Sequence, residues 1–399
     1  MNTRLLAAAA ATVVACSGVA RAGDDALSYA LSETEALSLS LNAPGALYIG
    51  VQTQFRYMVN SRDDSAGALG DSDTTIGFNM RRAKVTMKGD VTDNIKGEIV
   101  FSFGHDTGYA KITDAFADWK VSDDVTLRIG QFKLPILREE SVSSKKQLAV
   151  ERSATNETFN QDRSQGVQAM FGGDNWRAMV AFSDGLNSDN TAFNAPVPMG
   201  GTYGPEADYA FTGRAEFKFG DAGWDQFDQF TSFRGAASGM LVGGSVHWQT
   251  QGDTNPAVSP EQDILLVTAD ASYVADGWNL FGAFIFRNTD AGAGADFDDS
   301  GAVIQGGLFV SDQTELYARW DAVFADSARG MTGDDFNSIS FGINHYLVPE
   351  SHAAKLTLGA GFTLDPTTTS IVSTSDGHNL LTDADDGQFS LIAQAQFLF

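Results

Sequence analysis

The sequence has little of what a disulfide-stabilised, membrane-helical or nucleic-acid-binding protein needs. It contains one cysteine, Cys16, and 26 Lys and Arg against 51 Asp and Glu, for a formal net charge of −25. After the amino-terminal segment it has no run of 18 apolar residues. A single cysteine leaves no disulfide framework, and the lack of a long apolar run predicts no transmembrane helix. The acidic balance opposes binding to nucleic acid, which requires a basic face.

Sequence motifs of catalysis and of metal binding are also missing. The five histidines are scattered, and there is no His-Glu-x-x-His, Gly-x-Ser-x-Gly or P-loop motif. We therefore predict no enzymatic activity, no catalytic residues and no cofactor. Acidic runs at 296–299 and 383–386 lack the Gly and Glu of an EF-hand loop. Solvated loops are the favoured interpretation of these runs, and Ca²⁺ bridging to lipid headgroups is the alternative.

The first 22 residues predict an export signal. Arg4 is followed by an apolar stretch at 5–14 and by the small-x-small sequence Ala20-Arg21-Ala22. Cleavage after Ala22 would remove Cys16 and leave a mature chain without cysteine; a lipoprotein signal at Cys16 is the alternative. Residues 23–43 are expected to form a periplasmic lead-in segment, either a short helix or irregular.

From residue 44 onward, strand-like stretches alternate with short and long connections. Tight turns such as 93–94 and 173–174 alternate with long polar loops such as 60–75, 134–163 and 185–207. This rhythm is typical of an outer-membrane barrel, which has short periplasmic turns and long external loops. We predict sixteen strands, near 45–59, 76–90, 94–105, 110–121, 124–133, 164–172, 175–184, 208–219, 238–250, 262–274, 278–288, 301–311, 314–323, 336–348, 353–365 and 387–399.

The predicted fold is thus all-β, with one transmembrane antiparallel β-barrel of about 16 strands over residues 44–399. Apolar and polar residues alternate within the strands, which suits an apolar outer face and a polar lumen. A soluble sandwich shows the same alternation, but not an even strand count with one end kept short. One connection breaks the rhythm, because 220–237 is long on the short side. Its aromatic residues at spacing three predict a helical turn at the barrel mouth or membrane interface, with a binding site as the alternative.

Charge is unevenly spread along the chain. Residues 81–163 hold 14 Lys and Arg against 13 Asp and Glu, whereas 164–399 hold 8 against 30. Alternation and the loop 134–163 predict a basic pore lining that consists of Arg82, Lys84, Lys88, Lys96, Arg128, Lys145, Lys146 and Arg152. Basic side chains in a narrow pore favour anions. The alternative is that these charges pair with acidic neighbours and select nothing.

Several stretches resemble the phosphate-selective porin O and P family of Gram-negative outer membranes. They are 81–103, 114–136, and 151–153 followed by 164–171, with Gly130-Gln131-Phe132-Lys133-x-Pro135 the most specific. The resemblance implies a trimeric, sixteen-stranded porin whose third external loop, here 134–163, folds into the lumen. It also implies that Phe399 is read by the barrel-assembly machinery.

These observations together predict a channel in the cell outer membrane that passes small hydrophilic solutes by passive diffusion. The expected partners are small anions or other solutes, outer-membrane lipids and two further copies of the chain. A bias toward anions or phosphate would come from the basic patch. Two alternatives stay open: a general or cation-preferring porin, and a plugged structural or adhesive barrel.

Overall fold

The computed structural model describes most of the predicted barrel. The described residues are 37–39, 47–62, 74–104, 108–160, 162–186, 188, 207–251, 261–292, 294, 296–330, 335–367, 371–372, 383 and 385–399. The predicted signal peptide 1–22 and most of the lead-in segment 23–43 lie outside these residues. Large parts of the long loops 60–75, 185–207, 251–261 and 366–386 also lie outside them.

Sixteen strands in the described part of the chain form a closed antiparallel barrel. Each pairs with its neighbours in sequence order, and β17 pairs back onto β2, with Phe389 opposite Ser61 and Leu398 opposite Gln52. The strands are β2 (Leu47–Ser61), β3 (Thr74–Thr92), β4 (Ile95–Phe103), β5 (Ala110–Lys120), β6 (Val125–Phe132), β7 (Ser164–Gly172), β8 (Trp176–Ser183), β9 (Tyr209–Gly220), β10 (Gly239–Gln251), β11 (Gln262–Ala275), β12 (Trp278–Asp290), β13 (Phe297–Phe309), β14 (Thr314–Phe324), β15 (Asp335–Tyr346), β16 (Ala354–Thr363) and β17 (Phe389–Leu398). Closure pairs the strand edges that hydrocarbon would otherwise leave without hydrogen bonds.

The predicted barrel is therefore confirmed, and each predicted strand overlaps an observed one. The largest shift at the start of a strand is in β13, which begins at Phe297 rather than near 301, because its first residues extend the pairing with β12. A further strand, β1 (Leu37–Leu39), pairs with Leu47–Ile49 at the beginning of β2.

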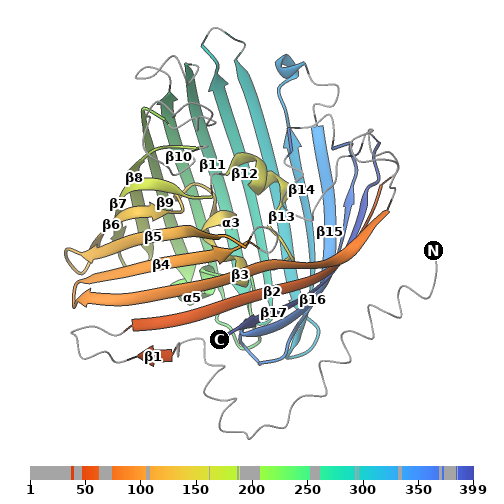
Figure 1. Ribbon diagram of the computed structural model, residues 1–399, viewed down its shortest axis with the longest axis horizontal. Helices are drawn as coiled ribbons and strands as arrows, with labels where there is room; N and C mark the ends of the chain where they lie inside the picture. The colour runs from red at the N-terminus through yellow and green to blue at the C-terminus, as the bar shows by residue number, and fades with distance from the viewer. Residues whose placement is uncertain are drawn as a thin grey trace, which may run out of the picture.

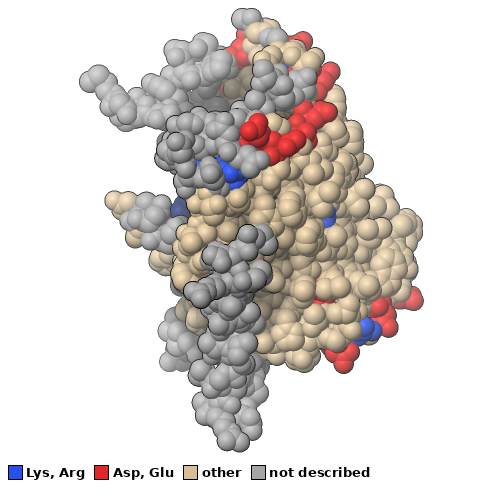
Figure 2. All heavy atoms as spheres, turned by 90° about the vertical axis from the view of Figure 1, so that its right-hand side faces the viewer, with Lys and Arg blue, Asp and Glu red and all other residues tan. Residues whose placement is uncertain are grey.

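The outer wall is apolar. Large side chains that point outward from the strands are about half exposed, including Phe217, Leu280, Phe284, Ile304 and Leu308. Figure 2 shows one side of this wall as a broad band almost free of charged residues, which gather near its two ends. An apolar band between two polar rims is the arrangement that a barrel in a lipid bilayer requires.

A β-bulge changes which side chains reach the lumen. The pairing of β2 with β3 shifts so that Gln54 faces Arg82 while the next residue, Phe55, faces Met80. Arg81 is thus the extra residue in β3, and its side chain reaches the same carboxylate as that of Arg82. Regular alternation would place Arg81 on the outer face, opposite to Arg82, but the bulge brings both side chains to the inner face.

Gly130 turns the end of β6 toward the lumen. Its φ of 133° is one that residues with a side chain rarely adopt. A Cβ at this position would lie 2.8 Å from the Phe116 Cα and closer still to the Ala115 carbonyl oxygen. Glycine is therefore required here, and directly after it the chain buries Phe132 and Leu134 inside the barrel.

The loop after β6 packs on the inner side of the barrel. It carries α3 (Arg138–Ser141), η2 (Ser144–Lys146) and α4 (Ala154–Phe159), and Figure 1 shows α3 within the ring of strands. We call residues 133–163 the inner loop. Its apolar residues Leu137 and Phe159 pack with residues of β11, β12 and β14, namely Ile264, Leu266, Ile285 and Val323.

The long connection between β9 and β10 also enters the barrel. It contains the short helix α5 (Trp224–Phe227), and the side chains of Phe227 and Phe230 are buried. This short helix is the helical turn predicted for 220–237. No helix in the described residues is long and apolar enough to cross a membrane.

Candidate functional site inside the barrel

The inner loop covers one side of the lumen and leaves the other open. Side chains that point inward from β10–β16 are buried beneath it, among them His247, Asp270, Glu315, Arg319 and Asn344. Towards the end with short connections, the inward side chains of β3–β6 remain accessible to solvent; those of Lys88 and Lys96 are 58% and 70% exposed. The open part of the lumen therefore lies beside β3–β6.

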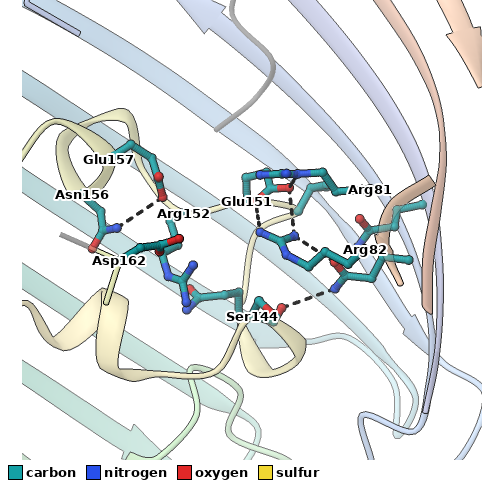
Figure 3. A network of polar contacts seen from close by, with 12 residues as sticks. Arg81, Arg82, Ser144, Glu151, Arg152, Asn156, Glu157 and Asp162 are labelled. Atoms are coloured by element: carbon teal, nitrogen blue, oxygen red, sulfur yellow. Dashed lines mark hydrogen bonds and ion pairs between the residues drawn. The ribbon is translucent and has the colours of Figure 1, made fainter. Parts of the chain in front are cut away.

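One carboxylate joins the inner loop to β2 and β3. Glu151 is buried and accepts hydrogen bonds from Arg56, Arg81 and Arg82 (Figure 3). Arg81 Nε lies 2.6 Å from Oε1, and Arg82 Nη2 lies 2.7 Å from Oε2. Burial alone raises the pKa of the Glu151 carboxyl, but the three guanidinium groups together hold the pKa well below its usual value. Glu151 therefore stays ionised, and this cluster keeps two positive charges in excess.

Lys84 lies one residue pair further along the inner face of β3. Its charged neighbours are Arg82, Lys133, Arg163 and Asp114. Among the described residues, none forms a hydrogen bond or an ion pair with the Lys84 ammonium group. The charged form of a lysine among three cations and one carboxylate is electrostatically unfavourable, and an anion that approaches it would stabilise that form.

A second ionic cluster joins the start of the inner loop to its middle. Glu140 accepts from Lys133 at 2.8 Å and from Arg152 at 3.0 Å. Burial lowers the pKa of the Lys133 ammonium group to about 8, with the Arg152 charge acting in the same direction and Glu140 opposing it. Burial raises the pKa of the Asp162 carboxyl, but Arg163 and the other nearby cations outweigh this effect and lower the pKa to about 2.

The two clusters meet around Lys84 and are positive in sum. We call them together the basic cluster; its seven basic members are Arg56, Arg81, Arg82, Lys84, Lys133, Arg152 and Arg163. The acidic partners within it are Asp114, Glu140, Glu151 and Asp162. With every member ionised, seven positive charges face four negative ones, which leaves three positive charges in excess.

Towards the end with short connections, the open wall is close to neutral. Lys88 pairs with Glu98 at 2.9 Å, and Lys96 lies 3.8 Å from Asp90. Arg128 makes two hydrogen bonds to Asp118, at 2.7 and 2.8 Å, and its guanidinium carbon lies 3.9 Å from the Phe116 ring centroid. Each of these three predicted pore-lining cations thus has an acidic partner on the wall.

The remaining predicted residues lie on the inner loop. Lys145 and Lys146 are in η2, where Gln396 Nε2 donates to the Lys145 carbonyl oxygen at 3.1 Å. Arg152 is buried, and its guanidinium group donates to the carbonyl oxygens of Glu139, Glu140 and Val142. Arg152 therefore holds segments of the inner loop together through its Nε and Nη2 atoms.

The wall that the inner loop covers binds its backbone. Arg319 donates to the Glu151 carbonyl oxygen at 2.8 Å, Asn344 to that of Leu148 at 2.8 Å, and Lys355 to that of Gln147 at 2.9 Å. On the β9–β10 side, Arg214 and Ser245 donate to the Ile136 carbonyl oxygen. Contacts with opposite walls fix the position of the loop across the lumen.

Sequence reasoning missed several members of this site, among them Arg81, Glu151 and Lys133. Arg81 was hidden by the bulge, which alternation does not reveal. Glu151 was read only as part of a resembling stretch, and the three arginines that it pairs with are remote in sequence. Lys133 was assigned to the end of a strand, whereas the chain has already left the wall at Phe132.

A closed sixteen-stranded barrel with an apolar outer wall and a charged lumen is the architecture of an outer-membrane channel. The model of the family described as phosphate-selective porin O and P matches residues 51–331. The chain therefore belongs to the phosphate-selective porin O and P family. It is an outer-membrane protein of a channel-forming family rather than of an enzyme family.

Solved structures share the fold at low sequence identity. An anion-selective porin from Comamonas acidovorans has a TM-score of 0.63 at 13% identity, over 89% of this chain and all of that chain. OmpT of Vibrio cholerae in its trimer form has a TM-score of 0.56 at 13% identity, over 90% of this chain and all of that chain. Salmonella typhi OmpF in complex with daunomycin has a TM-score of 0.59 at 9% identity, over 91% of this chain and all of that chain. The comparison with curated proteins gave no match.

Proposed function

We propose that this channel passes small hydrophilic solutes by passive diffusion and prefers anions, including phosphate, with the inner loop as its constriction. The observation that carries the proposal is the excess of positive charge around Lys84, whose ammonium group forms no ion pair within the described residues. An anion that enters beside β3 meets Lys84, Arg82 and Arg163 together.

Local charge decides selectivity more than net charge does. A narrow passage between protein walls has a lower effective dielectric constant than water, so each charge there acts more strongly on a passing ion. Charges on the outer rims lie in high-dielectric solvent and are screened within about 10 Å at 0.1 M salt. Much of the acidic excess of the chain falls after residue 163, and in Figure 2 the visible acidic residues gather near the rims. The positive charge of the basic cluster should therefore determine the ion preference more than the acidic residues at the rims do.

Planar-bilayer recording of the purified protein tests this proposal. Under a KCl gradient the reversal potential should have the sign of anion preference, and added phosphate should reduce the chloride current. Lys84→Gln should weaken both effects. Lys88→Gln is the matched control, since Lys88 is already paired with Glu98 and should change them less.

Two outcomes would support other functions. A reversal potential of cation sign, without block by phosphate, would favour the general or cation-preferring porin that the net charge suggests. Absence of any channel would favour a plugged structural barrel, although the solvent-accessible inner side of β3–β6 argues against a filled lumen.

We further propose a homotrimer that associates through the side of the barrel with the shorter strands, where the wall is lower. Strands β4–β8 contain 8–11 residues, whereas β10–β12 contain 13 or 14. A low wall spans less of the bilayer and is better covered by a second protomer than by lipid. The trimer form of OmpT from Vibrio cholerae is consistent with this assembly. We also propose that the chain is cleaved after Ala22 and contacts outer-membrane lipids. The assembly machinery would recognise Phe399.

A further inference from the structure

The connection between β9 and β10 is bonded directly to the tip of the inner loop. The backbone N–H of Phe230 donates to the Lys146 carbonyl oxygen at 3.1 Å. Arg138, at the start of α3, donates to the Phe227 carbonyl oxygen, and its guanidinium carbon lies 5.5 Å from the Phe230 ring centroid. Two segments that enter the barrel from opposite ends therefore meet in the lumen.

Phe230 fills the contact between these segments. Its side chain is 3% exposed and packs in one cluster with Val142, Leu148 and Ala149 of the inner loop and with Phe281 and Tyr317 of the wall. The ring centroids of Phe230 and Phe281 are 4.8 Å apart. Removal of this ring would leave a cavity directly beneath the segment that carries η2.

The rest of the connection is fixed to the barrel itself. Phe233 packs against Phe309, Tyr346 and His352, with ring centroids 5.1–5.5 Å apart. Thr231 Oγ1 lies 2.9 Å from the Tyr346 hydroxyl, and Ser232 Oγ donates to the Ala275 carbonyl oxygen at 2.5 Å. The residues that follow Phe230 are thus fixed to the barrel wall, and Phe230 packs against the inner loop from this fixed position.

We propose that the 221–238 connection is a positioning element of the channel, which supports the Lys145–Lys146 turn of the inner loop and sets the pore's size limit. Polar groups of the wall also contact this turn: Gln52 and Gln54 donate to Ser144, and Gln396 donates to the Lys145 carbonyl oxygen. The connection adds the buried apolar contact. Phe230 acts on solutes only through the loop.

Liposome swelling with neutral sugars of increasing size tests this inference independently of ion preference. Phe230→Ala should admit sugars that the unchanged protein excludes, and Phe230→Leu should restore much of the exclusion because it refills the cavity. Phe233→Ala is the matched control: it removes an equal ring from the same connection, and the ring partners of Phe233 are Phe309, Tyr346 and His352 of the barrel. An unchanged size limit in folded Phe230→Ala would overturn the proposal, as would an equal change in both alanine variants.

A second design covers the case in which Phe230→Ala does not fold. Lys146→Cys with Phe230→Cys places two thiols on residues whose backbones are hydrogen-bonded, in a chain whose predicted mature form has no other cysteine. The oxidised protein should keep the size limit and the reduced protein should lose it. Equal swelling rates for large sugars in the two redox states would contradict the positioning role.

Discussion

Arg82 and Glu151 form a two-bonded ion pair between the barrel wall and the middle of the inner loop. Arg82 Nη2 lies 2.7 Å from Glu151 Oε2, and Nη1 lies 3.0 Å from Oε1. Both side chains are buried, and Arg82 Nη1 also donates to Gln54 Oε1 at 2.8 Å. The pair thus couples the position of the loop to the charge of the lumen wall.

Glu151→Gln should both increase anion preference and lower the stability of the barrel. The variant leaves three arginines without their carboxylate, so the basic cluster gains a positive charge. Removing one partner of a buried ion pair typically costs about 3–5 kcal/mol. We expect a larger anion-sign reversal potential and a lower temperature for the shift in migration of the folded protein on gels.

Glu157→Gln is the charge-matched control for that experiment. Glu157 lies on the same loop in α4, where its carboxylate accepts from Asn156 at 3.3 Å. Equal shifts of reversal potential in both variants would mean that total charge, and not the three-arginine arrangement, sets the preference.

Anion preference should fall between pH 7 and pH 9. The pKa of Lys133 is about 8, lowered mainly by burial, so its ammonium group is charged below pH 8 and neutral above it. Loss of this positive charge reduces the excess in the basic cluster as the pH rises. Reversal potentials recorded at the two pH values check this, and Lys133→Arg, which stays charged, should reduce the change. A pH response that survives in Lys133→Arg would assign it to another group.

Asp118→Asn should raise anion preference although it alters no basic residue. The substitution frees Arg128, which in the unchanged protein makes two hydrogen bonds to the Asp118 carboxylate. Because both side chains are about one quarter exposed, the stability cost should stay within about 1 kcal/mol. Arg128→Gln, by contrast, should change the reversal potential in the opposite direction. If neither variant alters the reversal potential, this part of the wall does not influence the ions.

Gly130→Ala should impair folding of the barrel. The backbone of Gly130 has φ 133°, and a Cβ there would collide with the Ala115 and Phe116 backbone. Strain of this kind costs on the order of 1–3 kcal/mol before the collision is counted. The fraction of protein with folded migration on gels should drop. Gly172→Ala, at a position with open space for a Cβ, should fold normally.

The alternation of apolar and polar residues was sufficient to predict the strands, because one side of the wall faces lipid and the other faces the polar lumen. Phe389, Leu391 and Phe397 face outward, while Ser390 and Gln396 are buried inside, as alternation predicted. The same rule failed at Arg81, since a bulge depends on the register of two strands and not on either sequence alone.

The sequence by itself determined the barrel, its number of strands and the family, because period-two patterning, turn residues and the Gly130 motif are local properties of the chain. Only the tertiary structure decided which charges act. It brought Glu151 to Arg56, Arg81 and Arg82, gave Arg128 a partner in Asp118, and left Lys84 among cations. The electrostatic effect of a side chain depends on its distance to groups remote in sequence and on the solvent it has lost, and folding alone fixes both.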